Sequence, residues 1–356
     1  MYTILAINPG STSTKIALFE DDSLIFEKTL RHSSEDLAPY EKIADQCDFR
    51  MELILDALKE SGHKVGNLEA VVGRGGLVKP IAGGTYAINE SLLEDSKSGL
   101  QGEHASNLGA VLSRKIADSV GIPSFIVDPV VVDEMQEVAR ISGHPLFVRK
   151  SIFHALNQKA VAYRYAEEVE KNYRDMHLIV AHLGGGVSVG AHSGGRVIDV
   201  NNALDGSGPF SPERSGGLPM GDFAKLCFSG QCNQDQIKKM LTGKGGYVAY
   251  LGTQDGIEVA RRIKEGDEKA KLIQEAFCYQ VSKEIGACAA VLKGKVDGII
   301  LTGGLVYNED IARTIGEHVE FIAPVVVYPG EDEMEALAAG ALRVMRGEEK
   351  AKEYES

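Results

Sequence analysis

The sequence predicts an α/β protein built from two similar domains, each with the element order βββαβαβ followed by a helix. The length of 356 residues leaves room for two domains with full cores. Three predicted strands joined by two turns, the first of which contains glycine, occur at the N-terminus and again near the middle of the chain. In both halves, helical segments and single strands follow in the same order. Two such duplicated βββαβαβα domains are expected to face a central cleft, where loops of both sheets meet one ligand.

The first half begins with short apolar runs separated by turn residues. Asn8-Pro9-Gly10 is a strong turn signal, and β-branched and apolar residues continue on either side of it. Later segments have either the apolar spacing of a helix or the short apolar run of a buried strand. We predict strands at 2–7, 14–19, 24–30, 68–73 and 124–127, and helices at 49–60 and 104–120.

The second half repeats this order. IVAHLGGGVSVGAHSG can be laid over ILAINPGSTSTKIALF without gaps. We predict strands at 178–183, 187–191, 196–200, 298–302 and 321–328, and helices at 270–292, 309–316 and 333–345. The domains are placed at 1–150 and 151–330, and the helix within 331–356 is expected to pack on either of them.

Composition narrows the class of protein. Apolar residues make up 44% and charged residues 25%, as in ordinary globular proteins. A net charge of −13 argues against a nucleic-acid or anionic-membrane partner. Five scattered cysteines without a CxxC pair argue against a disulfide framework or a zinc site. With no signal-peptide pattern and no apolar run of transmembrane length, a cytoplasmic location is expected.

Glycine-rich turns close four predicted strands. Glycine lets a ligand approach the backbone, and N–H groups of such turns bind phosphate, helped by hydroxyls and ammonium groups. A single turn of this kind more often only reverses a strand, but four in a repeated architecture indicate nucleotide binding. The candidate residues are Asn8, Ser11, Ser13 and Lys15 in the first turn, Arg74 to Gly76, Gly184, Gly185 and Gly186, and Gly303 and Gly304.

Charged residues near these turns suggest further chemistry. Arg74 follows a buried-type strand and Arg214 lies in the irregular segment 201–222, and arginine binds carboxylate or phosphate through two parallel hydrogen bonds. Asp128 and Glu333 are candidate Mg²⁺ ligands, although Glu333 could equally complement a helix dipole. His154 stands between apolar neighbours, where a histidine is more often a core residue than a catalyst.

Taken together, these motifs resemble the acetate and butyrate kinase family, which has the ribonuclease H-like fold of actin, sugar kinases and heat-shock ATPases. INPGSTSTKIAL resembles its N-terminal signature in the butyrate kinase form. Further matching blocks follow in the expected order: VVGRGG, VDPV, RKSIFHALNQKAVA, AHLGGGVSV, PFSPERSGGLPMGD, LTGGLVYNEDI and GEDEMEALAAGA. The resemblance implies reversible transfer of the γ-phosphoryl group of ATP to a short-chain carboxylate with Mg²⁺, giving ADP and an acyl phosphate. We also expect a homodimer or larger homo-oligomer.

The resemblance also implies residue roles. The first turn, from Asn8 to Lys15, handles phosphate and metal, and Arg74 and Arg214 hold the carboxylate and the transferring phosphoryl group. Further implied roles are metal coordination or orientation by Asp128 and Glu333, transition-state stabilisation by His154, and nucleotide binding by the turns at His182 to Gly186 and Gly303-Gly304.

Two positions depart from the acetate kinases. Gln158 stands where they have a second histidine, and Gly185 where they have asparagine in the glycine turn. Gly75 and Gly76 also replace two valines after the arginine. The smaller residues predict room for butyrate and branched C4–C5 acids, with Gly76 and Phe153 lining the pocket.

Two alternatives stay open at this stage. A sugar or polyol kinase of the same fold would use Asp128 as the base that deprotonates a hydroxyl. An actin-like or chaperone-like ATPase would need sequence for filament contacts or client binding, and little is left for it.

Overall fold

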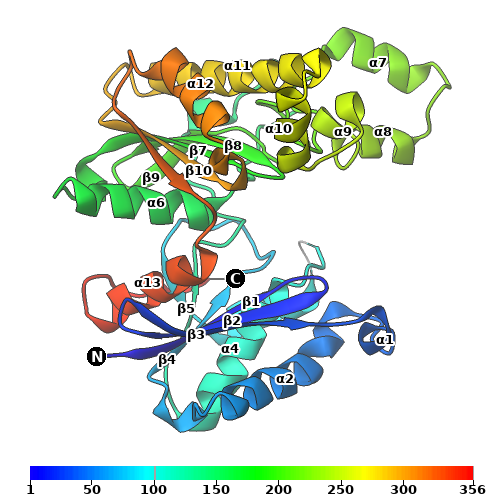
Figure 1. The fold of residues 1–356 in the computed structure, drawn as a ribbon. Coiled ribbons are helices and arrows are strands. Elements are labelled where there is room, and N and C mark those ends of the chain that lie inside the picture. Colours follow the sequence, from blue (N-terminus) through cyan, green and yellow to red (C-terminus); the bar gives the residue numbers. More distant parts are fainter. Residues whose placement is uncertain (100–101, 356) are drawn as a thin grey trace. The chain divides into compact units, whose positions relative to one another are not determined.

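The computed structural model of the chain describes residues 1–99 and 102–355 (Figure 1). It divides into two compact units. Unit 1 comprises Met1–Val132 and Asp332–Ser356, and unit 2 comprises Asp133–Glu331. Among the described residues, no helix is long and apolar enough to cross a membrane.

Unit 1 contains a six-stranded sheet in the order β3-β2-β1-β4-β6-β5. β1, β2 and β3 are antiparallel, β4 and β6 extend the sheet in parallel with β1, and β5 pairs antiparallel with β6. The strands are β1 (Thr3–Pro9), β2 (Ser13–Glu20), β3 (Ser23–Arg31), β4 (Ala70–Arg74), β5 (Thr85–Ala87) and β6 (Ser124–Val127). The helices are α1 (Ser34–Leu37), η1 (Ile43–Gln46), α2 (Cys47–Glu60), η2 (Val65–Asn67), α3 (Glu90–Ser98), α4 (Asn107–Val120) and α13 (Glu333–Met345).

Helices cover both faces of this sheet. Leu5 and Ile7 of β1 belong to the core that α2 and α4 complete. Residues of alternate parity point to the other face, where Val127 meets α13 so closely that a Cβ added to Gly340 would lie 2.6 Å from its methyl groups. The last helix of the chain therefore packs on the sheet of the first strands, as the red and blue elements of Figure 1 show.

Unit 2 repeats this plan. Its sheet order is β11-β10-β7-β8-β9, which matches β6-β4-β1-β2-β3 strand for strand. The strands are β7 (His177–Leu183), β8 (Val187–Ser193), β9 (Arg196–Val200), β10 (Gly298–Gly303) and β11 (Val325–Pro329). The helices are α5 (Glu137–Arg140), α6 (Ala155–Glu168), η3 (Tyr173–Asp175), α7 (Met220–Phe228), α8 (Gln234–Leu241), α9 (Gly246–Leu251), α10 (Gly256–Lys264), α11 (Glu268–Val291), η4 (Gly304–Tyr307) and α12 (Glu309–Val319). The predicted α/β class with a duplicated domain topology is confirmed.

The sequence places the domain boundary at about 150, whereas the two compact units separate between Val132 and Asp133. Residues 133–150 join unit 2 through a buried ion pair, in which Lys159 Nζ lies 2.9 Å from Glu134 Oε2. The backbone N–H of Gln136 also donates to Ile198 O. The helix of residues 333–345, which the sequence assigned to neither domain, belongs to unit 1.

Several helices have no counterpart in the prediction. α7 and α8 contain no buried residue, although apolar residues recur at helical spacing in both, for example Ile237, Met240 and Leu241 in α8. α6 was quoted only as a motif, although it lies against the sheet of unit 2. The expected strand at 321–328 is shorter and begins at Val325, after Pro324.

Candidate active site

Three predicted site residues meet in unit 1. β1 and β4 are parallel neighbours, with Ile7 beside Gly73, so Asn8 and Arg74 leave the same edge of the sheet. Glu333 reaches them from the first turn of α13. Glu333 Oε1 lies 2.7 Å from Arg74 Nη1, and Asn8 Nδ2 donates to Glu333 Oε2 at 2.6 Å. This part-buried group of one cation and two oxygen-bearing side chains suits both an anion and a divalent cation.

Asp128 has an unusual backbone in the same unit. It follows β6 with φ of 36°, a conformation that is strained for a residue with a Cβ. Its carboxylate is 3% exposed and accepts a hydrogen bond from Gly84 N at 2.7 Å. Within residues 1–99 and 102–355, no group of three or more His, Cys, Asp or Glu could hold a metal. Mg²⁺, which keeps several waters, needs only one or two protein carboxylates.

The N-terminal turn is held from behind by Arg50, which the sequence analysis missed. Arg50 is fully buried in α2 and donates to the carbonyl groups of Gly10 at 2.8 Å, Ser13 at 3.0 Å and Ser11 at 3.2 Å. Burial lowers the pKa of its guanidinium, yet an arginine stays charged in proteins. An arginine at a core-facing position of a helix, three residues after Cys47 and four before Ile54, was the signal available in the sequence.

The hydroxyls of this turn are accessible, since Ser11 is exposed and Ser13 half-buried. Lys15 lies two residues after Ser13 in β2 and forms an ion pair with Glu27 of β3 at 2.9 Å. Both side chains of this pair are 39% exposed, so the pair is weak and a ligand could displace Glu27.

Gly76 does not leave an empty space where its side chain would be, so the reason given for a substrate pocket there finds no support in these contacts. A Cβ at Gly76 would lie 2.5 Å from Asn107 Cα, and one at Gly75 would lie 2.5 Å from Pro129 Cβ. These glycines allow the loop to contact the N-terminus of α4 and the segment after β6. Leu77, whose N–H donates to Asn107 Oδ1 at 2.8 Å, is the first side chain after Arg74.

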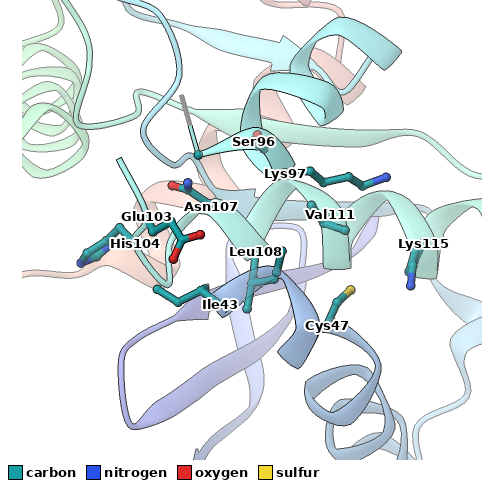
Figure 2. Close-up of a pocket in the computed structure, with 12 residues that line it drawn as sticks. Ile43, Cys47, Ser96, Lys97, Glu103, His104, Asn107, Leu108, Val111 and Lys115 are labelled. Atoms are coloured by element: carbon teal, nitrogen blue, oxygen red, sulfur yellow. The ribbon is translucent and has the colours of Figure 1, made fainter. Parts of the chain in front are cut away.

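Unit 1 also has a pocket of about 220 Å³ between α2, α3 and α4 (Figure 2). Its apolar lining includes Ile43 of η1, Cys47 of α2, and Leu108 and Val111 of α4, and the charged Lys97, Glu103 and Lys115 also line it. Burial raises the pKa of the Cys47 thiol, which therefore stays protonated. At the opposite end lies His104, whose pKa is lowered by desolvation and then by the charge of Arg74.

In unit 2, His154 and His182 stack with ring centroids 3.7 Å apart and an angle of 11° between the ring planes. His154 stands at the N-cap of α6 and His182 near the end of β7. His182 Nδ1 contacts Asn157 Oδ1 at 2.7 Å, and its Nε2 lies 3.0 Å from Glu331 Oε1. Phe153, predicted to form an apolar wall, is 3% exposed.

Arg214 reaches the same place. A Cβ at Gly186 would lie 2.0 Å from Arg214 Nη1 and 3.2 Å from His154 Cε1, so this glycine admits both side chains. Arg214 Nη1 also donates to Ala203 O at 2.6 Å, and burial lowers the pKa of its guanidinium. Three predicted residues of unit 2, His154, His182 and Arg214, thus gather at the glycine turn after β7.

The remaining glycines differ in what surrounds them. A Cβ at Gly303 would lie 2.4 Å from Leu183 O, so this glycine, at φ 96°, is required by the close approach of β7. Gly185 and Gly304, in contrast, have open space where a Cβ would lie. Both line a concavity of about 410 Å³, together with Gly184 and Glu331.

A larger pocket of about 580 Å³ shares Gly304 and Leu305 with this concavity. It is bounded by α10, α11, η4 and the start of α12, and its polar lining includes Asp255, Gln274 and Asn308. The sequence analysis singled out none of these three. The two adjoining spaces have the size of small-molecule sites, polar backbone at one end and mixed side chains at the other.

Known proteins resemble this chain in sequence and in fold. The model of the acetokinase family matches residues 137–325. Over 354 residues, 99% of this chain and 100% of the relative, the sequence is 61% identical to butyrate kinase 1 of Clostridium acetobutylicum. It is 59% identical to butyrate kinase 2 of that organism, over 99% of both chains. The fold matches the crystal structure of Porphyromonas gingivalis acetate kinase with a TM-score of 0.79 at 21% identity, over 97% of this chain and 100% of that one. The chain belongs to the acetokinase family.

Proposed function

We propose that this protein is a kinase that transfers the γ-phosphoryl group of ATP reversibly to a short-chain carboxylate, and that butyrate and branched C4–C5 acids are its substrates. The observation that carries the proposal is the 61% identity over nearly the full length to a protein named butyrate kinase. The clusters around Arg74 and Arg214 support it, because each presents a guanidinium to an anion.

The nucleotide is assigned to unit 2. In this proposal the pocket of about 580 Å³ takes the base and ribose, and the adjoining turn residues Gly184, Gly185 and Gly304 take the phosphates. The open backbone at Gly185 and Gly304 supports this assignment, since phosphate oxygens need close access to N–H groups.

Metal and acceptor are assigned to unit 1. Asn8, Asp128 and Glu333 offer the oxygen donors that Mg²⁺ prefers and would hold it directly or through water. When bound, Mg²⁺ neutralises charge on the phosphate oxygens. Arg74 would bind the acceptor carboxylate, which is ionised at neutral pH and needs no base. Arg214 and His154 would stabilise the charge that spreads over the transferring phosphoryl group.

A hydroxamate assay tests the proposal, because only an acyl phosphate reacts with hydroxylamine to give a coloured complex. The panel contains C2 to C6 acids, with glycerol and sugars as controls for the sugar kinase alternative. We expect acyl phosphate with butyrate and Mg-ATP. The proposal would be rejected if none of the acids gave acyl phosphate. It would also be rejected if ATP were consumed with a sugar and with none of the acids.

Variants of the two arginines connect the activity to the proposed site. Arg74→Ala and Arg214→Ala should each lower kcat about 10²–10³-fold, as removal of a transition-state donor does. Lysine at either position should restore little activity, because its ammonium group lacks the planar guanidinium that forms two parallel hydrogen bonds. Arg114→Ala, which removes a surface arginine of α4 paired with Asp118, is the control and should keep full activity.

A further inference from the structure

A continuous chain of buried hydrogen bonds leads through unit 2 to His154. Tyr173 Oη lies 2.7 Å from His192 Nδ1, and His192 Nε2 lies 3.0 Å from Gln158 Oε1. Gln158 Nε2 lies 2.8 Å from Ser188 Oγ, which in turn lies 2.9 Å from His154 Nδ1. All members except His154 are at most 1% exposed, so water cannot replace their partners.

The local structure explains why these side chains meet. Ser188, Gly190 and His192 alternate along β8 and share the face that α6 covers. Gln158 lies one helical turn after His154 in α6. A Cβ at Gly190 would lie only 2.5 Å from Gln158 Oε1, so glycine at this position makes room for the amide between Ser188 and His192.

The direction of each hydrogen bond follows from the orientation of the Gln158 amide group. Gln158 Nε2 lies 3.0 Å from the carbonyl oxygen of Ser188, which can only accept, so this atom must be the NH₂ group. Gln158 Oε1 therefore accepts from His192 Nε2–H. Burial lowers the pKa of His192 to about 3, so its ring is neutral and its Nδ1 accepts from the hydroxyl of Tyr173.

The hydrogen bond between Ser188 and His154 can be assigned a direction in the same way. Ser188 Oγ accepts from Gln158 Nε2 at 2.8 Å, and the backbone N–H of His154 lies 3.5 Å away, at the outer limit of a hydrogen bond. Ser188 is fully buried, so its hydroxyl hydrogen needs an acceptor, and among these contacts His154 Nδ1 is the atom that can accept it. A ring that accepts at Nδ1 is neutral and carries its proton on Nε2. Every hydrogen bond of the chain points toward His154, an order in which successive bonds polarise one another.

We propose that this chain holds His154 as the neutral Nε2–H tautomer, and that Ser188 and Gln158 are positioning residues for it. The inference rests on the proposed function and adds which atom of His154 acts: Nε2 donates a hydrogen bond to the transferring phosphoryl group, and no imidazolium is needed.

A spectroscopic measurement tests the tautomer without any use of activity. In protein labelled with ¹⁵N-histidine, long-range ¹H–¹⁵N correlation spectra distinguish Nδ1–H, Nε2–H and doubly protonated rings. The signal of His154 is identified by its loss in His154→Gln. We expect a pyridine-type Nδ1 and a protonated Nε2 at neutral pH. A protonated Nδ1, alone or with Nε2, would overturn the proposal.

Kinetics test the role of the atom. Glutamine can place its NH₂ group near ring Nε2, whereas asparagine reaches only the Nδ1 position. We expect His154→Gln to keep at least about 10-fold more kcat than His154→Asn, a part of the 10²–10³-fold that one such donor contributes. Equal or reversed activities would overturn the proposal.

Ser188→Ala should lower kcat about 10-fold while both KM values stay within about twofold, the pattern of a lost transition-state interaction. Tyr165→Phe is the matched control, because its hydroxyl donates from the same helix to Asp297 O outside the chain. A fall in kcat that Tyr165→Phe shares would show a merely structural effect and overturn the role of Ser188. A wild-type protein that makes no acyl phosphate would reject the proposed function, whereas the spectrum would still decide the tautomer.

Discussion

Replacing Arg50 by methionine should destabilise unit 1 more than any surface substitution. The guanidinium is fully buried and donates to three carbonyl groups of the N-terminal turn. It also donates to Thr14 Oγ1 at 3.0 Å and to Gln46 Oε1 at 2.8 Å and 3.1 Å. Methionine fills much of the same volume with no donor, so the oxygens around it lose their partner.

The magnitude follows from the number of oxygens left without a donor. Gly10 O and Ser11 O lose the donor that Arg50 supplies, while Ser13 O keeps the hydrogen bond from Gly10 N at 2.8 Å. With Gln46 Oε1, about three acceptors are affected, at roughly 1 kcal/mol each, which gives about 3 kcal/mol. For a domain of this size, 1 kcal/mol shifts Tm by about 2–4 °C, so a decrease of roughly 6–12 °C is expected.

Thermal unfolding followed by circular dichroism, with urea unfolding in parallel, measures the effect. Arg346→Met is the control in the same unit, because that side chain is 35% exposed and its ion pairs with Asp21 and Asp22 contribute about 0–1 kcal/mol. Arg50→Lys should also be unstable, since one ammonium cannot span the turn and Gln46. If Arg50→Met unfolds within about 2 °C of the wild type, the hydrogen bonds of the guanidinium do not hold the turn, and the reasoning fails.

Two further predictions concern packing and pH. Gly76→Val should lower the free energy of unfolding by about 1–3 kcal/mol through its clash with Asn107 and should reduce activity with acetate and butyrate alike. A change in the ratio of the two activities would instead indicate that Gly76 lines the substrate pocket. The second prediction follows from burial, which lowers the pKa of His32 to about 4 and that of His192 to about 3. In the unfolded chain both histidines are protonated below about pH 6.5, whereas in the folded protein they stay neutral. The free energy of unfolding should therefore decrease as the pH is lowered from about 6.5 to about 4. Urea midpoints at several pH values measure this slope, which His192→Gln should reduce; an equal slope in that variant would contradict the assignment.

Local patterns in the sequence were enough to predict the repeated topology. The turns after β1, β4, β7 and β10 were found from glycines at the ends of short apolar runs, because a strand and its tight turn depend on a few adjacent residues. Parallel neighbours then end at the same edge, so Asn8 and Arg74 could be expected together before any contact was known.

The helices between Met220 and Lys264 were not predicted in the same way. They bury few residues or none, although apolar residues at helical spacing, such as Ile237, Met240 and Leu241 of α8, are present in this part of the sequence and were missed. Of the pocket residues, Asp255 comes from this region, whereas Gln274 and Asn308 lie in a predicted helix and a quoted motif, and only the tertiary structure brings the three to one pocket.

The sequence by itself determined the fold class, the glycine turns and most of the residues proposed to act. Only the tertiary structure decided which of them meet: Glu333 reaches Asn8 across 325 residues of sequence, and Gln158 reaches Ser188 across 30. It also shows that the absence of a side chain at Gly76 allows close contact with Asn107 of α4. The physical reason is that a hydrogen bond or a close contact depends on positions fixed by the packing of distant segments, whereas a turn or a strand is specified by its own neighbours.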